Sequence, residues 1–106
     1  MEEKSLGCIR KEGTRPIVEV LPETARPTKQ GEIIMDTPGY DIASVTSMVA
    51  GGGSLIVFTT GRGTPMGHAL APVLKVTGNR DTFERMHDNI DIGVCEIMEG
   101  TCTIEE

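Results

Sequence analysis

The chain of 106 residues has few aromatic side chains, no tryptophan and no long hydrophobic run. One tyrosine and two phenylalanines make up 3% of the sequence, so a core must be built from Val, Ile, Leu, Met and Ala. The longest strongly apolar stretch, residues 55–58, is far shorter than a membrane-spanning helix, and the N-terminal segment contains no signal-peptide core. Membrane insertion and secretion are therefore not expected.

Basic residues and cysteines are also scarce. Ten Lys and Arg against sixteen Asp and Glu give a net charge of −6, which has the wrong sign for a nucleic-acid binder. The bases neither cluster nor alternate with aromatic residues, so nucleic acid is not an expected partner. Cys8, Cys95 and Cys102 form neither a C-x-x-C motif nor a His-paired ligand spacing. They are typical of reduced, mostly buried thiols, and we expect a cytoplasmic protein.

Length and hydrophobic patterning predict one domain, residues 1–106. A short helix is predicted over residues 2–11, and a short edge strand or extended segment lies between the prolines at 16 and 22. The strand at 32–36, the helix at 41–50 and the strand at 54–58 together predict a right-handed parallel crossover unit.

A third strand is predicted over residues 71–76, followed by a helix that starts at Asp81 with a capping-box-like Glu84. Phe83, Met86, His87 and Ile90 would share one side of this helix, and the residues after 92 carry only weak signals. The expected architecture is an α/β fold: a small, mainly parallel sheet with crossover helices in a Rossmann-like, three-layer arrangement.

Residues 59–68 are the most unusual segment, with three glycines, three threonines, Arg62 and His68 directly after a buried strand. Ligands of open α/β sheets bind at the carboxyl ends of strands. Glycines there let the backbone approach an anion, threonine hydroxyls donate to it, and Arg62 can grip a carboxylate with two hydrogen bonds. The segment predicts a site for a small molecule bearing a carboxylate or phosphate. The alternative is a glycine-rich structural turn.

Other polar residues have both a functional and a structural interpretation. Tyr40 and Asp41 follow the preceding strand and would lie at the same sheet edge, but Asp41 also suits a helix cap. Lys75 lies in an apolar strand, either as a base of lowered pKa or as a side chain that reaches solvent from an edge. His68 and His87 form no paired ligand motif, so no metal site within this chain is predicted.

Several ordered motifs carry a resemblance to a known family. They are VFTTGRGTP at 57–65 with Gly67 and APVLK at 71–75, and further EEKSLG at 2–7, PTKQG at 27–31 and the segment 88–92. Together they closely resemble the C-terminal part of the altronate and galactarate dehydratase family, which includes the large subunit of sulfolactate sulfo-lyase.

The resemblance implies a hydro-lyase that converts a hydroxylated sugar acid to a 2-keto-3-deoxy acid, with Fe²⁺ or Mn²⁺ expected for the complete enzyme. It implies as partners a small-molecule hydroxy acid and the remainder of the enzyme or a complementary subunit; a homo-oligomer is a further option. No metal ligand can be named in this chain. The residues expected to bind substrate are Thr59, Thr60, Gly61, Arg62, Gly63, Thr64, Tyr40 and Asp41. The residues expected to act in proton transfer or electrostatics are Lys75, Lys4 and His68.

Three positions depart from the dehydratase pattern. Met66 stands where a tyrosine is usual, residues 38–41 read PGYD in place of PASD, and Gly93 replaces the asparagine of an Asp-Ile-Asn motif. The first two keep open a carbon–sulfur lyase that acts on sulfolactate. Family enzymes are several times longer, so we expect either an excised piece or a subunit of a split enzyme. A non-catalytic module that binds an organic anion or a partner, and a purely structural domain, are the alternatives to a lyase.

Overall fold

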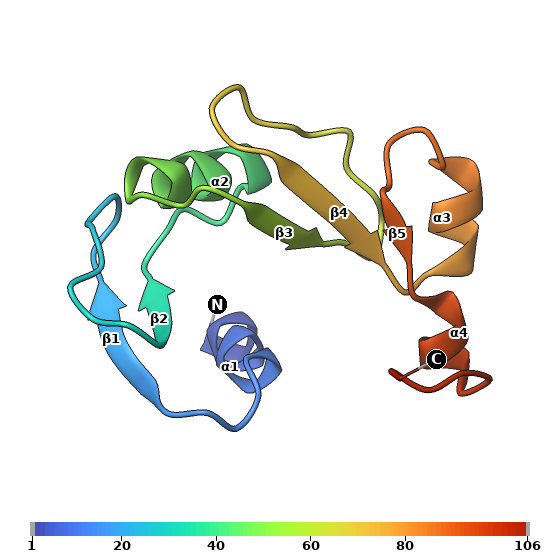
Figure 1. The fold of residues 1–106 in the computed structure, drawn as a ribbon, viewed down its shortest axis with the longest axis horizontal. Coiled ribbons are helices and arrows are strands. Elements are labelled where there is room, and N and C mark those ends of the chain that lie inside the picture. The colour runs from blue at the N-terminus through green and yellow to red at the C-terminus, as the bar shows by residue number, and fades with distance from the viewer. Residues whose placement is uncertain (1, 106) are drawn as a thin grey trace.

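The computed structural model describes the backbone of residues 2–105 and all their side chains except those of Glu2, Lys4, Ser5 and Cys8. Its elements in order are α1 (Glu2–Lys11), β1 (Ile17–Leu21), β2 (Glu32–Met35), α2 (Asp41–Ala50), β3 (Ile56–Thr59), β4 (Val73–Thr77), α3 (Arg80–Arg85), β5 (Ile92–Gly93) and α4 (Cys95–Glu99) (Figure 1). Every strand pairing is parallel. The expected α/β class with parallel strands is therefore confirmed.

The strands form two sheets, whereas the sequence predicted one. β1 pairs with β2, and β3, β4 and β5 form a separate three-stranded sheet in that order. Helix α2 thus connects two sheets, and the predicted crossover unit of residues 32–58 is wrong as a single-sheet unit (Figure 1). Its run lengths suited a crossover, but which strands pair is decided by contacts distant in sequence. The actual strand–helix–strand unit is β4–α3–β5, in which the Phe83 ring lies against Gly93.

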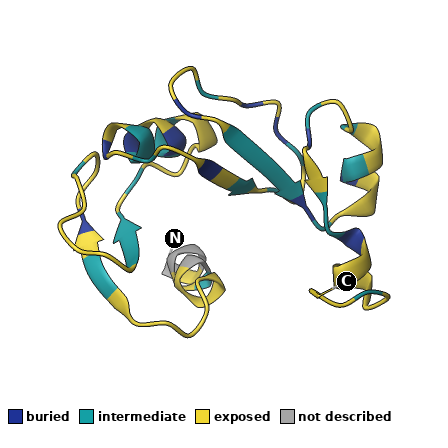
Figure 2. Cartoon of the chain, viewed as in Figure 1, coloured by how far each residue is buried: buried dark blue, intermediate teal, exposed yellow. Residues whose placement is uncertain are grey.

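A loop takes the place of a helix between β3 and β4. The connection between two parallel strands must return the chain to the end of the sheet where the first strand began. Residues 60–72 do this without regular structure. Met66 in this loop is buried together with Val45 of α2 and Ile56 of β3. Met66 therefore fills the space that an apolar helix face would otherwise occupy, and Figure 2 shows this core along α2 and the adjoining strands.

Both helix caps that the sequence predicted are wrong by one or two residues. Tyr40 is the N-cap of α2 and makes no side-chain capping bond, so Asp41 lies inside the first turn. There its negative charge interacts favourably with the positive end of the helix dipole and stabilises the helix. Asn79 is the N-cap of α3, and its Oδ1 accepts a hydrogen bond of 3.1 Å from the Thr82 N–H. Asp81 follows the cap inside the helix.

Helix α3 is also shorter than predicted. It ends at Arg85 with Met86 as the C-cap, so His87 and Ile90 lie beyond it. Ile90 still packs inward and is buried. Phe83 and Met86 are half-buried and His87 is exposed, so the predicted spacing was correct for the burial of Ile90 and wrong for His87 and for the length of the helix.

None of the helices within residues 2–105 is both long and apolar enough to cross a membrane.

Candidate functional site

The carboxyl ends of β3, β4 and β5 meet at one edge of the three-stranded sheet. The Thr60 N–H donates to the Val76 carbonyl at 2.9 Å, and the Val94 N–H donates to the Thr77 carbonyl at 2.8 Å. These bonds hold the chain at each strand end beside its neighbour. Two adjoining open hollows lie at this edge, and both are lined by Gly61, Gly78 and Met98.

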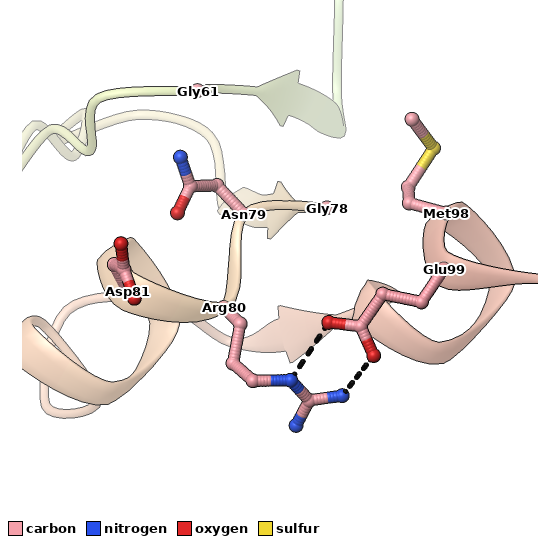
Figure 3. Close-up of a pocket in the computed structure, with 7 residues that line it drawn as sticks. All are labelled: Gly61, Gly78, Asn79, Arg80, Asp81, Met98 and Glu99. Atoms are coloured by element: carbon pink, nitrogen blue, oxygen red, sulfur yellow. Dashed lines mark hydrogen bonds and ion pairs between the residues drawn. The ribbon is translucent and has the colours of Figure 1, made fainter. Parts of the chain in front are cut away.

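The larger hollow has a volume of about 550 Å³. It lies between the end of β3, the turn from β4 into α3, and α4 (Figure 3). Its lining residues are Gly61, Gly78, Asn79, Arg80, Asp81, Met98 and Glu99. Charged side chains of both signs therefore border an apolar Met98.

The second hollow has a volume of about 460 Å³ and brings a lysine to the strand ends. Its lining residues are Lys11, Thr59, Thr60, Gly61, Val76, Gly78, Val94 and Met98. Two threonines and one lysine thus line a hollow whose other lining residues are apolar. Such a set of groups suits a small anion with hydroxyl substituents.

Arg80 is paired with carboxylates at the rim of the larger hollow. Its Nε and Nη2 donate to the two carboxylate oxygens of Glu99 at 2.8 and 2.7 Å (Figure 3). Nη2 also donates to a carboxylate oxygen of Glu96 at 3.1 Å. The hydrogen bond from Arg80 lowers the pKa of Glu99. A hydrogen bond from its own backbone, and then the one from Arg80, lower the pKa of Glu96. These bonds tie α4 to the start of α3.

Helix α3 holds the glycine-rich segment in place. The Thr82 hydroxyl, on a residue that is 2% exposed, donates to the Gly61 carbonyl at 2.8 Å. The Arg85 guanidinium donates to the Arg62 carbonyl at 3.2 Å. Gly63 has a φ of +89°, and a side chain there would collide with Met86. The segment is thus a defined turn against α3.

The hollows bring together only the first half of the predicted anion-binding segment. Thr59, Thr60 and Gly61 line them, whereas Arg62, Gly63 and Thr64 do not. The Thr60 hydroxyl also accepts a hydrogen bond from the Gly63 N–H at 3.0 Å.

Arg62 and Thr64 have opposite environments. The side chain of Arg62 is exposed, whereas Thr64 is buried and its hydroxyl accepts from the Met66 N–H at 3.3 Å. Arg62 is therefore available to a ligand approaching from solvent, and Thr64 holds the turn from inside.

Tyr40 and Asp41 lie in another place. They line a separate open hollow of about 320 Å³ with Gly39 and Ile42, at the start of α2. Because β2 belongs to the two-stranded sheet, its carboxyl end does not share an edge with β3. The prediction that these two residues lie at the same sheet edge as the glycine-rich segment is wrong for this reason.

Of the three residues predicted to act in proton transfer, His68 and Lys75 do not line the hollows. His68 is half-buried in the connecting loop, and its Nδ1 accepts from the Leu70 N–H at 3.2 Å. Lys75 is half-buried within β4, and its backbone N–H donates to Asp91 at 2.7 Å. The Lys4 side chain lies outside the described residues. The catalytic roles of all three remain predictions.

Among the residues that the structure describes, no three His, Cys, Asp or Glu side chains are grouped as metal ligands.

Sequence reasoning missed most of the β4 end of the site. Gly78 and Asn79 follow a strand that was predicted nearly in place, so the rule applied to the β3 end would have found them. Lys11 and Glu99 could not be found in this way. They reach the edge from elements at the two ends of the chain.

Comparison with known proteins supplies the family context. All of residues 1–106 match the family model described as D-galactarate/altronate dehydratase, C-terminal. The chain is 46% identical over 104 residues, 98% of its length, to the galactarate dehydratase (L-threo-forming) of Escherichia coli. It is 36% identical over 91 residues, 86% of its length, to the altronate dehydratase of Bacillus subtilis.

A third relative is named as a different kind of lyase. The chain is 34% identical over 107 aligned residues to the subunit beta of (2R)-sulfolactate sulfo-lyase from Chromohalobacter salexigens, with all of the chain covered. The chain spans 20%, 18% and 28% of the lengths of these three relatives. The resemblance that the ordered motifs carried is confirmed.

Proposed function

The chain belongs to the D-galactarate/altronate dehydratase family, whose C-terminal part it matches, and we propose that it forms the substrate-carboxylate site of a sugar-acid hydro-lyase. The substrate proposed is a 2,3-dihydroxy acid of the galactarate or altronate type. The product is the corresponding 2-keto-3-deoxy acid. The whole activity requires the larger part of the family sequence that this chain does not span.

The chemistry of this reaction defines what the site must supply. A base removes the C2 proton, hydroxide leaves C3 as water after protonation, and the resulting enol becomes the 2-keto acid by gaining a proton at C3. Removal of the C2 proton places negative charge on the neighbouring carboxylate. Cations and fixed hydrogen-bond donors around that carboxylate stabilise the charge as it forms.

One observation carries the proposal. The segment Thr59–Thr60–Gly61 leaves β3 at an edge where two open hollows meet, and Lys11 lines one of them. Hydroxyl donors, an ammonium group and an accessible glycine backbone at a strand end together suit a hydroxy acid. His68 and Lys75 line neither hollow, so the role proposed for this edge of the sheet is carboxylate binding. No step is assigned to Fe²⁺ or Mn²⁺.

The sulfo-lyase alternative keeps the support of the third relative, and one sequence argument for it weakens. Met66 is only 7% exposed and packs in the core with Val45 and Ile56, away from the hollows. The replacement of a tyrosine by Met66 is therefore a packing difference and no contact with substrate. Sugar-acid dehydration remains the function we favour.

Thermal unfolding with added acids tests the carboxylate site. We expect galactarate or altronate to raise the unfolding midpoint of this chain, because a ligand at about a hundred times its dissociation constant stabilises the native state by about 2.7 kcal/mol. In a domain of this size, that stabilisation raises the unfolding midpoint by several degrees. A rise with sulfolactate in place of the sugar acids would favour the sulfo-lyase alternative. Each acid is measured with and without Mn²⁺.

Lys11→Ala is the informative variant, because Lys11 is the basic residue that lines the second hollow with Thr59 and Thr60. We expect it to remove the rise in midpoint. Arg26→Ala, at an exposed arginine in the connection between β1 and β2, is the matched control and should keep it. A midpoint that none of the three acids changes, or a rise that survives Lys11→Ala, contradicts the proposed carboxylate site.

A further inference from the structure

One face of the three-stranded sheet is apolar and open. Side chains alternate along a strand, and residues paired across parallel strands point to the same face. The pairings Val57–Leu74 and Val76–Ile92 therefore put these four apolar side chains on one face. Val57 is 59% exposed and Ile92 is 40% exposed, which is unusual for the face of a parallel sheet.

The opposite face is covered in the expected way. Ile56, Phe58 and Val73 pack there against α2 and Met66, and the Phe83 ring of α3 lies against Gly93. α1 reaches the carboxyl end of the open face, where Lys11 lines the second hollow with Thr59 and Val76. It leaves Val57 open. Among the described helices, α2 and α3 thus cover only one of the two faces.

The edge of β3 is open as well. Within residues 2–105, β3 pairs only with β4. The N–H groups of Ile56 and Thr60 bond on the β4 side, to the carbonyls of Pro72 and Val76. By alternation, the N–H groups of Val57 and Thr59 point to the free edge. Natural edge strands carry charges, prolines or bulges that prevent further pairing. The sequence Ile-Val-Phe-Thr of β3 has none of these, and it is typical of a central strand covered on both faces.

We propose that the free edge of β3 and the open face defined by Val57, Leu74, Val76 and Ile92 bind a β-strand and an adjoining apolar segment from the region of the family that this chain does not span. The argument for this occupant is length. The chain covers 20% of the galactarate dehydratase relative. The rest of that protein is long enough to supply both the β-strand and the apolar segment. The inference rests on the part of the proposed function that assigns the chain to a larger enzyme, and it does not depend on the carboxylate site.

Hydrogen exchange of the Val57 and Thr59 amides tests this inference. The first sample is this chain alone. The second is the Escherichia coli galactarate dehydratase with its matching 104 residues replaced by this chain. We expect exchange of the two amides to be at least about tenfold slower in the chimera, because pairing protects amides that otherwise face water.

Val57→Lys and Leu70→Lys are the matched pair of variants. Val57→Lys places a charge in the proposed interface, and it should abolish the protection in the chimera while leaving the isolated chain folded. Leu70 is 83% exposed in the loop between β3 and β4, so Leu70→Lys should leave the protection unchanged. Lys11→Ala should also leave the protection unchanged, so a failed carboxylate site does not mimic a failed interface.

Equal exchange rates in the two samples would overturn the proposal. So would slow exchange in the isolated chain together with a dimer in light scattering that Val57→Lys dissociates, since the occupant would then be a second copy. If the chimera gives no soluble protein, the aligned strand of the unaltered galactarate dehydratase decides. Rapid exchange there overturns the proposal, and slow exchange supports it.

Discussion

The Thr82 hydroxyl fixes the glycine-rich turn to α3, and its removal should loosen the turn. Thr82→Val keeps the shape of a side chain that is 2% exposed and removes the 2.8 Å bond to the Gly61 carbonyl. A hydrogen bond of this kind contributes about 1 kcal/mol net, and because Gly61 is exposed, water replaces the lost donor at the carbonyl. We expect the unfolding midpoint to fall by about 5 °C in a domain of this size.

Stability alone does not identify the cause. Thr82→Ser keeps the hydroxyl but removes a buried methyl group, which costs about 0.8 kcal/mol, so both variants should unfold at similarly lowered temperatures. Amide exchange of residues 61–63 separates them. Thr82→Val should speed this exchange about fivefold, the equivalent of 1 kcal/mol, whereas Thr82→Ser should leave it near the wild-type rate. If both variants speed the exchange equally, or neither does, the hydroxyl does not hold the turn and the reasoning is refuted.

The turn, the helix cap and the ion pair at the site edge each give a further prediction. Gly63→Ala should cost at least about 1–2 kcal/mol by chemical denaturation, because Gly63 has a φ of +89° and faces Met86; Gly67→Ala, at a glycine with open space around it, is its control. Asn79→Ala should lower stability by about 1 kcal/mol through loss of the α3 cap, and an equal or larger loss from Asp81→Ala would show that the cap is misassigned. The pKa of Glu99 is lowered from 4.5 by Arg80, so the pair stabilises the fold above about pH 4.5 and this contribution is lost as the pH falls further. Arg80→Gln should therefore show a smaller drop in unfolding midpoint between pH 6 and pH 3 than the wild type, and equal drops would contradict this origin of the acid sensitivity.

Local signals in the sequence located most helices and strands but not their pairing. Residues 32–35, 41–50 and 56–59 form the strand, helix and strand that the pattern of apolar residues predicted. No local signal shows whether β2 and β3, which α2 connects, pair with each other in one sheet or belong to two different sheets. That choice depends on packing between residues distant in sequence, such as the contact of Met66, from a loop without periodicity, with Val45 and Ile56.

The α3 cap was missed for a related reason. Asn and Asp are both good N-caps, and propensity does not choose between Asn79 and Asp81. The structure chooses through the strand end, where the Asn79 N–H donates to the Thr77 hydroxyl at 3.2 Å and the helix starts at once. Helix α4 had no local signal strong enough to predict it, and its ion pairs to Arg80 connect residues 16 and 19 positions apart.

The open sheet face and the second hollow are parts of one surface. Thr59 and Val76 line the hollow and lie on the same face as Val57. A segment that covers Val57 and Leu74 and continues toward the strand ends therefore also forms a wall over the hollow. Exclusion of water from that space lowers the local dielectric and strengthens the attraction between Lys11 and a bound carboxylate. Docking at β3 and carboxylate binding at the strand ends should then stabilise each other, since each event favours the same arrangement of the β3 end.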